Sequence, residues 1–235
     1  MPYNTTKIAD GVHAIDEDGF VQCFLIEGDD RAALLDSCAG GGEDFKSAVL
    51  SLTSKPVQLV ITHSDQDHTG GQDYFRCRPQ MHPAEYARYA AKGNAGKTPE
   101  PLWEGQVIDL GGVKLEAALI PGHTPGSIAL LDRAGRRLFV GDTISDSHIY
   151  MFGDGRDLRA LIESLRKLEA MEPLVDAVHP AHGSPVLPTE WIAKTRVAAE
   201  KLLVGELEPK EPPFALPCKL YSHDGVNLLY YRPAD

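Results

Sequence analysis

The stretch Thr62-His63-Ser64-Asp65-Gln66-Asp67-His68-Thr69-Gly70-Gly71 decides how the rest of the chain is interpreted. It places two imidazoles and two carboxylates within six residues, directly after the apolar run 57–61 and directly before a glycine pair. Two carboxylates as close as Asp65 and Asp67 repel each other unless a cation holds them together. The pattern therefore predicts a metal site on a loop at the end of a strand, which is typical of an enzyme.

Three further fragments share this pattern, because each places a ligand-type side chain after an apolar run and beside Gly or Pro. They are Pro121-Gly122-His123-Thr124-Pro125-Gly126, Val140-Gly141-Asp142-Thr143 and His179-Pro180-Ala181-His182-Gly183. Small residues let the backbone turn tightly, and loops that follow several strands can converge on one edge of a sheet. We therefore expect His123, Asp142 and His182 to join the histidine-rich stretch at a shared centre.

Apolar periodicity predicts mixed strands and helices along the chain. Strands are expected at 12–15, 20–27, 32–35, 57–61, 79–82, 107–110, 113–120, 127–131, 137–140, 175–178, 219–223 and 226–231. Helices are expected at 43–53, 83–92, 158–168 and 189–204, the last with Thr189 as a candidate N-cap. This order favours an α/β fold in which helices cover sheets.

At this point the chain resembles the metallo-β-lactamase-fold superfamily of metal-dependent hydrolases. The resemblance rests on ordered signatures: Leu35-Asp36 at a strand end, the stretch from His63 to His68, and then His123, Asp142 and His182. It covers nearly the whole chain and implies a four-layer αββα sandwich, with residues 1–235 as a single metallo-β-lactamase-like domain.

The resemblance also implies roles for individual residues. His63, Asp65 and His123 match the ligands of a first metal, and Asp67, His68 and His182 match those of a second. Asp142 matches a carboxylate that bridges both metals, and Asp36 an acid that orients a ligand imidazole. Asp67 and Asp142 are the implied catalytic residues, acting with a hydroxide that bridges the two metals.

Asp65 departs from the commonest pattern of the family, H-x-H-x-D-H, which has histidine at this position. Two divalent metals would bring four positive charges, and Asp65, Asp67, Asp142 and a hydroxide would bring four negative ones. We expect zinc first, with manganese or iron as alternatives because harder ligands suit harder metals. We also expect a less acidic bridging water and a smaller gain for strongly anionic substrates.

Composition limits the classes of partner. The chain has 235 residues, 43% of them hydrophobic, and a net charge of −11, which disfavours nucleic acid and anionic membranes. The N-terminal residues lack a secretory signal, and no apolar run approaches the roughly 20 residues of a membrane span. Four cysteines without a C-x-x-C pair are expected to be ordinary thiols. We expect a cytoplasmic monomer or homodimer acting on a small molecule.

A second set of residues forms the candidate substrate pocket: His148, Tyr150, Tyr221 and His223. The first two lie in an apolar segment shortly after Asp142, and the last two lie at the final hairpin turn. Residues 83–105, with Tyr86, Tyr89 and Trp103, form either a lid over the site or a packed surface segment. His13, His82 and His179 are interpreted as surface or core residues.

The leading function is therefore hydrolysis of a small ester, thioester, lactone or phosphoester by a dinuclear metal centre. An alternative is an iron-dependent oxidoreductase of the same superfamily, acting on oxygen or a persulfide. A third is a non-catalytic binding protein on the same scaffold, which the complete ligand set disfavours. Elemental analysis followed by a broad substrate screen separates these three functions.

Overall fold

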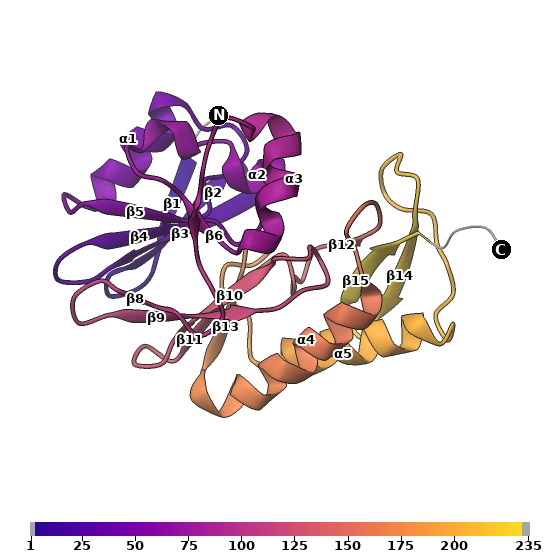
Figure 1. Ribbon diagram of the computed structural model, residues 1–235. Coiled ribbons are helices and arrows are strands. Elements are labelled where there is room, and N and C mark those ends of the chain that lie inside the picture. Colours follow the sequence, from indigo (N-terminus) through magenta and orange to yellow (C-terminus); the bar gives the residue numbers. More distant parts are fainter. Residues whose placement is uncertain (1–2, 232–235) are drawn as a thin grey trace.

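Two sheets face each other in the computed structural model, which describes residues 3–231 (Figure 1). The strands of the first sheet follow chain order from one edge to the other: β1 (Tyr3–Ala9), β2 (Val12–Glu17), β3 (Val21–Glu27), β4 (Ala32–Leu35), β5 (Val57–Val60), β6 (Gln80–Met81) and β7 (Glu100–Pro101). β1 to β4 pair antiparallel, whereas β4 to β7 pair parallel. The carboxyl ends of β4 and β5 therefore lie at the same edge of the sheet.

The second sheet has the order β13-β11-β10-β9-β8, and a smaller sheet has the order β12-β15-β14. Their strands are β8 (Val107–Asp109), β9 (Lys114–Leu119), β10 (Ile128–Asp132), β11 (Arg137–Gly141), β12 (Ile149–Met151), β13 (Ala177–Pro180), β14 (Lys219–His223) and β15 (Val226–Tyr230). β11 and β13 pair parallel, so Asp142 and His182 both follow strands that end at one edge. β12 pairs parallel with β15, which joins two segments distant in the sequence.

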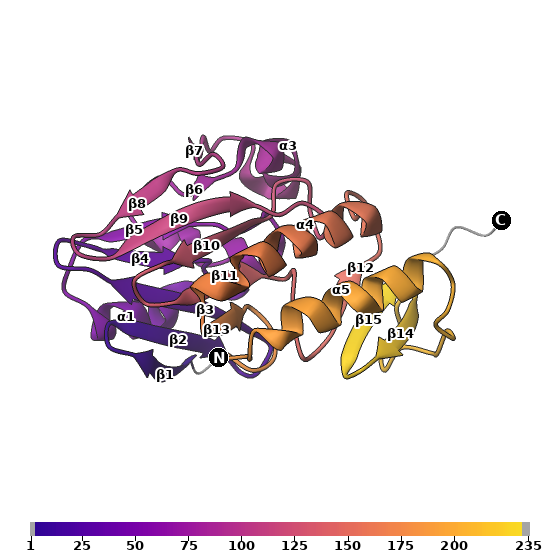
Figure 2. The same ribbon diagram turned by 90° about the horizontal axis from the view of Figure 1, so that it is seen from below.

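Helices cover the outer faces of the two sheets. They are α1 (Gly42–Leu52), α2 (Gln66–Thr69), α3 (Tyr86–Tyr89), α4 (Leu158–Met171) and α5 (Glu190–Leu203), with short helical turns at Gln72–Tyr74, Pro83–Glu85, Ala90–Asn94 and Glu172–Leu174. Figure 2 shows α4 and α5 running side by side across the second sheet, and α5 also contacts β14 and β15. Among residues 3–231, the helices are too short or too polar to span a bilayer.

Apolar side chains fill the space between these layers. Phe24 of the first sheet meets Phe139 of the second with ring centroids 5.2 Å apart. Phe45 of α1 packs on the outer face of the first sheet, and Leu161 and Leu165 of α4 pack on the second. The predicted four-layer αββα sandwich is confirmed.

Most predicted elements are present within a residue or two of their expected bounds, but three strands were missed, one of seven residues and two short ones. β1 is polar and largely exposed, β7 has two residues, and β12 lies in the segment interpreted as an apolar loop. Thr189 makes no capping bond to α5, because its hydroxyl instead donates to Glu172 Oε1 at 3.0 Å. The cysteines are free thiols, three of them buried, as expected.

Candidate metal centre

The predicted ligands lie together at one edge of the two sheets. Asp36 follows β4, the histidine-rich stretch follows β5, Asp142 follows β11 and His182 follows β13, while His123 lies in the loop between β9 and β10. α2 begins just after Asp65 and carries Asp67 and His68 on a single turn. This loop packs closely: a Cβ atom on Gly70 would lie 1.9 Å from the carbonyl oxygen of Ala39, so the position requires glycine.

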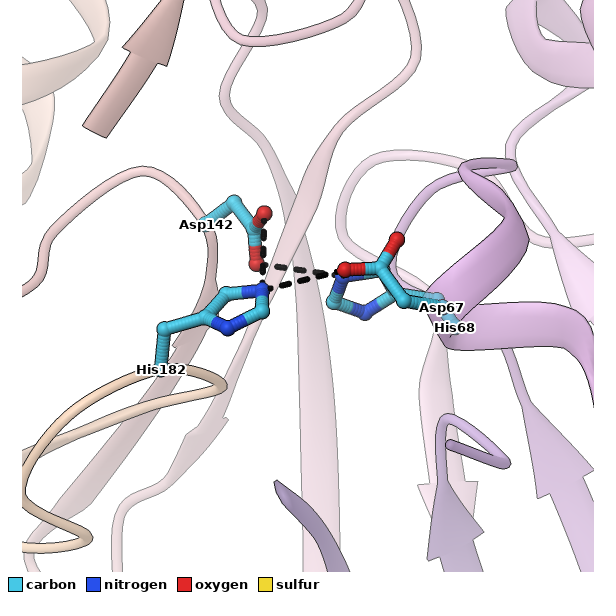
Figure 3. Close-up of side chains that lie close together, drawn as sticks. All are labelled: Asp67, His68, Asp142 and His182. Carbon is cyan, nitrogen blue, oxygen red and sulfur yellow. Dashed lines mark ion pairs between the residues drawn. The ribbon is translucent and has the colours of Figure 1, made fainter. Parts of the chain in front are cut away.

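Asp67, His68, Asp142 and His182, which we call the second group, have ligand atoms within 4.8 Å of one another (Figure 3). His182 Nε2 lies 3.3 Å from Asp67 Oδ2 and 3.3 Å from Asp142 Oδ2. His68 Nε2 lies 3.2 Å from Asp142 Oδ1 and 3.7 Å from Asp67 Oδ2. Two ligands of one tetrahedral zinc ion, each about 2.1 Å from the metal, are about 3.4 Å apart. The second group has the spacing of a metal site.

His63, Asp65 and His123, which we call the first group, are equally close. His123 Nε2 lies 3.2 Å from His63 Nε2 and 3.4 Å from Asp65 Oδ2, and His63 Nε2 lies 3.6 Å from that oxygen. Asp142 Oδ2 lies between the groups, 3.5 Å from His123 Nε2 and 3.8 Å from His63 Nε2. The structure thus brings together all seven side chains that the resemblance implied as ligands.

A single carboxylate, Asp36, fixes imidazoles of both groups. Its Oδ2 lies 2.8 Å from His68 Nδ1 and accepts the Thr62 hydroxyl at 2.7 Å. The Thr62 hydroxyl has one proton, which it donates to Asp36. In its contact of 3.1 Å with His63 Nδ1, the imidazole must therefore be the donor. Both imidazoles therefore carry the proton on Nδ1 and turn the Nε2 lone pair toward the centre.

Two further observations fit a cation. The Nδ1 atom of His182 lies 2.6 Å from the carbonyl oxygen of Phe20 and donates to it, which turns Nε2 toward Asp67 and Asp142. Within residues 3–231, the buried atoms His68 Nε2 and Asp142 Oδ1 form an ion pair at 3.2 Å, but neither makes a hydrogen bond. Buried polar atoms are nearly always satisfied, so these atoms are expected to bind an ion. The donor set fits divalent metals.

The pKa values of the histidines differ between the two groups. Burial alone would lower the pKa of His182, but the Asp142 and Asp67 carboxylates raise it to about 10. Burial lowers the pKa of His123 to about 4, against the opposing effect of Asp65 and Asp142. The carboxylates of the second group therefore favour a positive charge strongly, whereas the surroundings of His123 do not.

Glu85 is a supporting residue that the sequence analysis missed. Its Oε2 accepts from the backbone N–H and hydroxyl of Ser64 at 2.8 and 2.5 Å, and its Oε1 accepts from the Gly126 N–H at 2.8 Å. Burial would raise its pKa, but the hydrogen bonds from Ser64 and Thr124 lower it. The buried carboxylate thus ties the histidine-rich loop to the loop that carries His123.

Asp65 is surrounded by three positive side chains that the sequence analysis also missed. It pairs with Arg88, Lys92 and Arg156, which we call the cationic cluster. Burial would raise the pKa of Asp65, but the facing His123 and His63 imidazoles and Arg156 hold it well below its usual range. The charge count made from the sequence did not include these cations, because they are distant from Asp65 along the chain.

A cavity of about 750 Å³ opens above both groups. His148 and Tyr150 line it as expected, together with residues not foreseen, Phe20, Arg156, Phe214 and Leu216. Tyr221 is instead buried in the core against Tyr230, and His223 does not line this cavity. None of residues 83–105 lines it either, so that segment does not form a lid here. Phe214 and Leu216, which lie between α5 and β14, provide one wall.

The sequence profile of the metallo-beta-lactamase superfamily matches residues 16–182, which contain every ligand of both groups. The chain belongs to this superfamily. The metallo-beta-lactamase from Pontibacter korlensis has the same fold, with a TM-score of 0.72 and 20% identity over 84% of this chain and 99% of that one. The metallo-beta-lactamase superfamily is metal-dependent, typically with two divalent ions, which agrees with the paired groups.

Two curated members of the metallo-beta-lactamase superfamily are similar in sequence. The acyl-coenzyme A thioesterase MBLAC2 of Gallus gallus is 28% identical over 158 residues, covering 54% of this chain and 57% of its own. The atrochrysone carboxyl ACP thioesterase AgnL7 of Paecilomyces divaricatus is 27% identical over 187 residues, covering 74% of this chain and 55% of its own. The matches therefore span about half the length of these relatives.

Proposed function

We propose that this protein is a hydrolase that cleaves a small thioester with two divalent metal ions, one in each group. The observation that carries the proposal is the position of Asp142. Its Oδ2 lies 3.3 Å from His182 Nε2 and 3.5 Å from His123 Nε2, so one carboxylate faces both groups. Ions in such paired sites can act on the same substrate.

Zinc is the metal we propose first, because four imidazoles contribute to the two groups. Three carboxylates, Asp65, Asp67 and Asp142, keep manganese and iron as alternatives. When bound, the metals would acidify water and polarise the carbonyl group of the substrate.

The side chains around the groups have distinct tasks in this proposal. Asp67 lines the cavity and is partly exposed, so it is the carboxylate placed to hold a proton of the attacking water. Asp142 is more deeply buried, and its Oδ2 faces both groups, so it holds them at a fixed distance from each other. Phe20, Phe214 and Leu216 give the cavity an apolar wall against which an acyl chain can pack.

The choice of a thioester rests on the relatives and on charge. The two relatives described above are both named thioesterases. The net charge of −11 disfavours a polyanion such as nucleic acid as substrate, whereas a short acyl group suits the apolar wall.

The test is elemental analysis of the purified protein, followed by a substrate screen with the native metal restored. We expect zinc, and release of free thiol from short acyl thioesters faster than hydrolysis of a lactone or a phosphodiester. Asp142→Asn should lower thioester hydrolysis at least about 100-fold, because it removes a shared ligand. The matched control is Asp224→Asn at an exposed turn, which should leave hydrolysis unchanged.

Two results would contradict the proposal. A metal-loaded protein that cleaves phosphodiesters but no thioester would reject the substrate class. Bound iron with oxygen consumption and no hydrolysis would instead support the oxidoreductase alternative.

A further inference from the structure

The cationic cluster holds both oxygens of Asp65. Arg88 Nη2 donates to Oδ1 at 3.1 Å, and Lys92 contacts the same oxygen. Arg156 Nη2 donates to Oδ2 at 2.5 Å. These side chains are 20%, 33% and 10% exposed, so water screens their charge only in part.

Arg156 competes for the atom that a metal in the first group would need. Asp65 Oδ2 is the oxygen that faces His123 Nε2 at 3.4 Å and His63 Nε2 at 3.6 Å. Because Arg156 donates to this same oxygen, less of its electron density is available to a metal. Arg156 Nη1 also donates to the His123 carbonyl oxygen at 2.6 Å, which fixes the guanidinium beside the group.

The second group has the opposite electrostatic setting. It contains two carboxylates, Asp67 and Asp142, and the Asp36 carboxylate lies behind His68 at 2.8 Å. Among the described residues, no Lys or Arg forms an ion pair with any of these three acids. The first group combines its own carboxylate, Asp65, with three cations, of which Arg88 also pairs with Glu85. The second group combines Asp67 and the shared Asp142 with no Lys or Arg partner among the described residues.

We propose that a divalent metal ion binds to the second group first and to the first group only afterwards. The cationic cluster sets the difference in metal affinity between the two groups. A divalent ion in the first group adds two positive charges beside three that are already present, whereas in the second group it neutralises negative charge. This inference concerns metal binding alone and does not depend on the substrate class proposed above.

In the first experiment, a chelator removes bound metal from the whole chain, and zinc is then titrated back. The readouts are calorimetry and the zinc content after dialysis against metal buffers. We expect one tight equivalent and a second that binds at least about 100-fold more weakly. His182→Ala should remove the tight step, and His123→Ala should remove the weak step only. A single step of two equivalents, or loss of the tight step in His123→Ala, would overturn the proposal.

The second experiment changes the cluster. Arg156→Met should tighten the weak step about tenfold, and Lys92→Met, which leaves the His123 contact intact, should act in the same direction. Arg156→Lys keeps the charge, although an ammonium group cannot reproduce both contacts of the guanidinium, so it should tighten the weak step less than Arg156→Met does. Arg133→Met is the control, because it removes the same charge at the other end of β10, where Arg133 pairs with Glu116.

Each outcome of the second experiment is decisive. The proposal fails if Arg156→Met and Lys92→Met leave the difference in zinc affinity between the two steps unchanged. It fails as well if the control Arg133→Met reduces that difference by the same amount. It also fails if Arg156→Lys tightens the weak step as much as Arg156→Met, since the retained positive charge would then have no effect on the difference in affinity. If zinc binds in the proposed order but the protein hydrolyses no thioester, only the proposed function is rejected.

Discussion

At the scale of single residues, Asp36 has the widest influence, because one carboxylate orients His68 directly and His63 through Thr62. Its backbone has a φ of 65°, a left-handed conformation that Asn tolerates well. Asp36→Asn should therefore fold, yet replace one accepting oxygen by an amide group. We expect zinc affinity to fall about 10- to 100-fold, as is usual when a group behind a ligand is changed.

Asp36→Asn should weaken both zinc-binding steps, measured by competition with a chromogenic chelator. Gln22→Ala is not a suitable control because Gln22 supports the His182 loop through the Pro180 carbonyl oxygen. The exposed Asp224→Asn variant is preferable. Weakening of one step alone would contradict the role assigned to the Thr62 relay.

At the scale of elements, Glu85 joins the loop after β5 to the loop between β9 and β10. Glu85→Gln places an amide donor against backbone N–H donors, and should lower the free energy of unfolding by about 2 kcal/mol at neutral pH. The pKa of Glu85 is lowered from its ordinary 4.5. The ionised Glu85 therefore adds its full contribution to the free energy of unfolding above that value. This contribution is lost as the pH falls through the folded-state pKa.

The measurement is urea unfolding of metal-free wild type and Glu85→Gln between pH 7 and pH 4. The difference in unfolding free energy should be largest near neutrality and should shrink toward pH 4. Glu190→Gln on the surface of α5, where Glu190 pairs with Lys194, should stay within about 0.5 kcal/mol throughout. A constant difference across the pH range would contradict an ionised Glu85.

Elements and ligands differ in how far the sequence predicts them. His63 to His68 are close together in the chain, and His123, Asp142 and His182 each stand beside Gly or Pro after an apolar run, so local pattern pointed to these residues and the family resemblance implied their roles. Arg156 and Asp65 are 91 residues apart, and neither carries a local signal of their contact. β1 was missed because its exposed Thr and Lys side chains lack the alternation of a half-buried strand.

At the scale of the whole molecule, the proposed metal ligands come from both sheets. Asp67 and His68 follow β5 of the first sheet, whereas Asp142 and His182 follow β11 and β13 of the second. An ion that joins these side chains stabilises the packing of one sheet on the other. With free zinc at 1,000 times its dissociation constant, the gain is about 4 kcal/mol, or roughly 10 °C in Tm.

Chelation should therefore lower the Tm by roughly 10 °C in differential scanning calorimetry, and added zinc should restore it. His182→Ala should show a much smaller response to the chelator, because the tight position is already lost. Equal Tm values with and without chelator in the wild type would contradict a metal link between the sheets.

The pairing of β12 with β15 has a consequence for the order of events during synthesis. Ile149 and Tyr150 align with Leu228 and Leu229, so the cavity wall at His148 and Tyr150 needs a strand translated well after His182. Domains begin to fold while the ribosome is still adding residues. All seven proposed ligands, from His63 to His182, are thus translated before β15, the strand that supports this wall of the cavity.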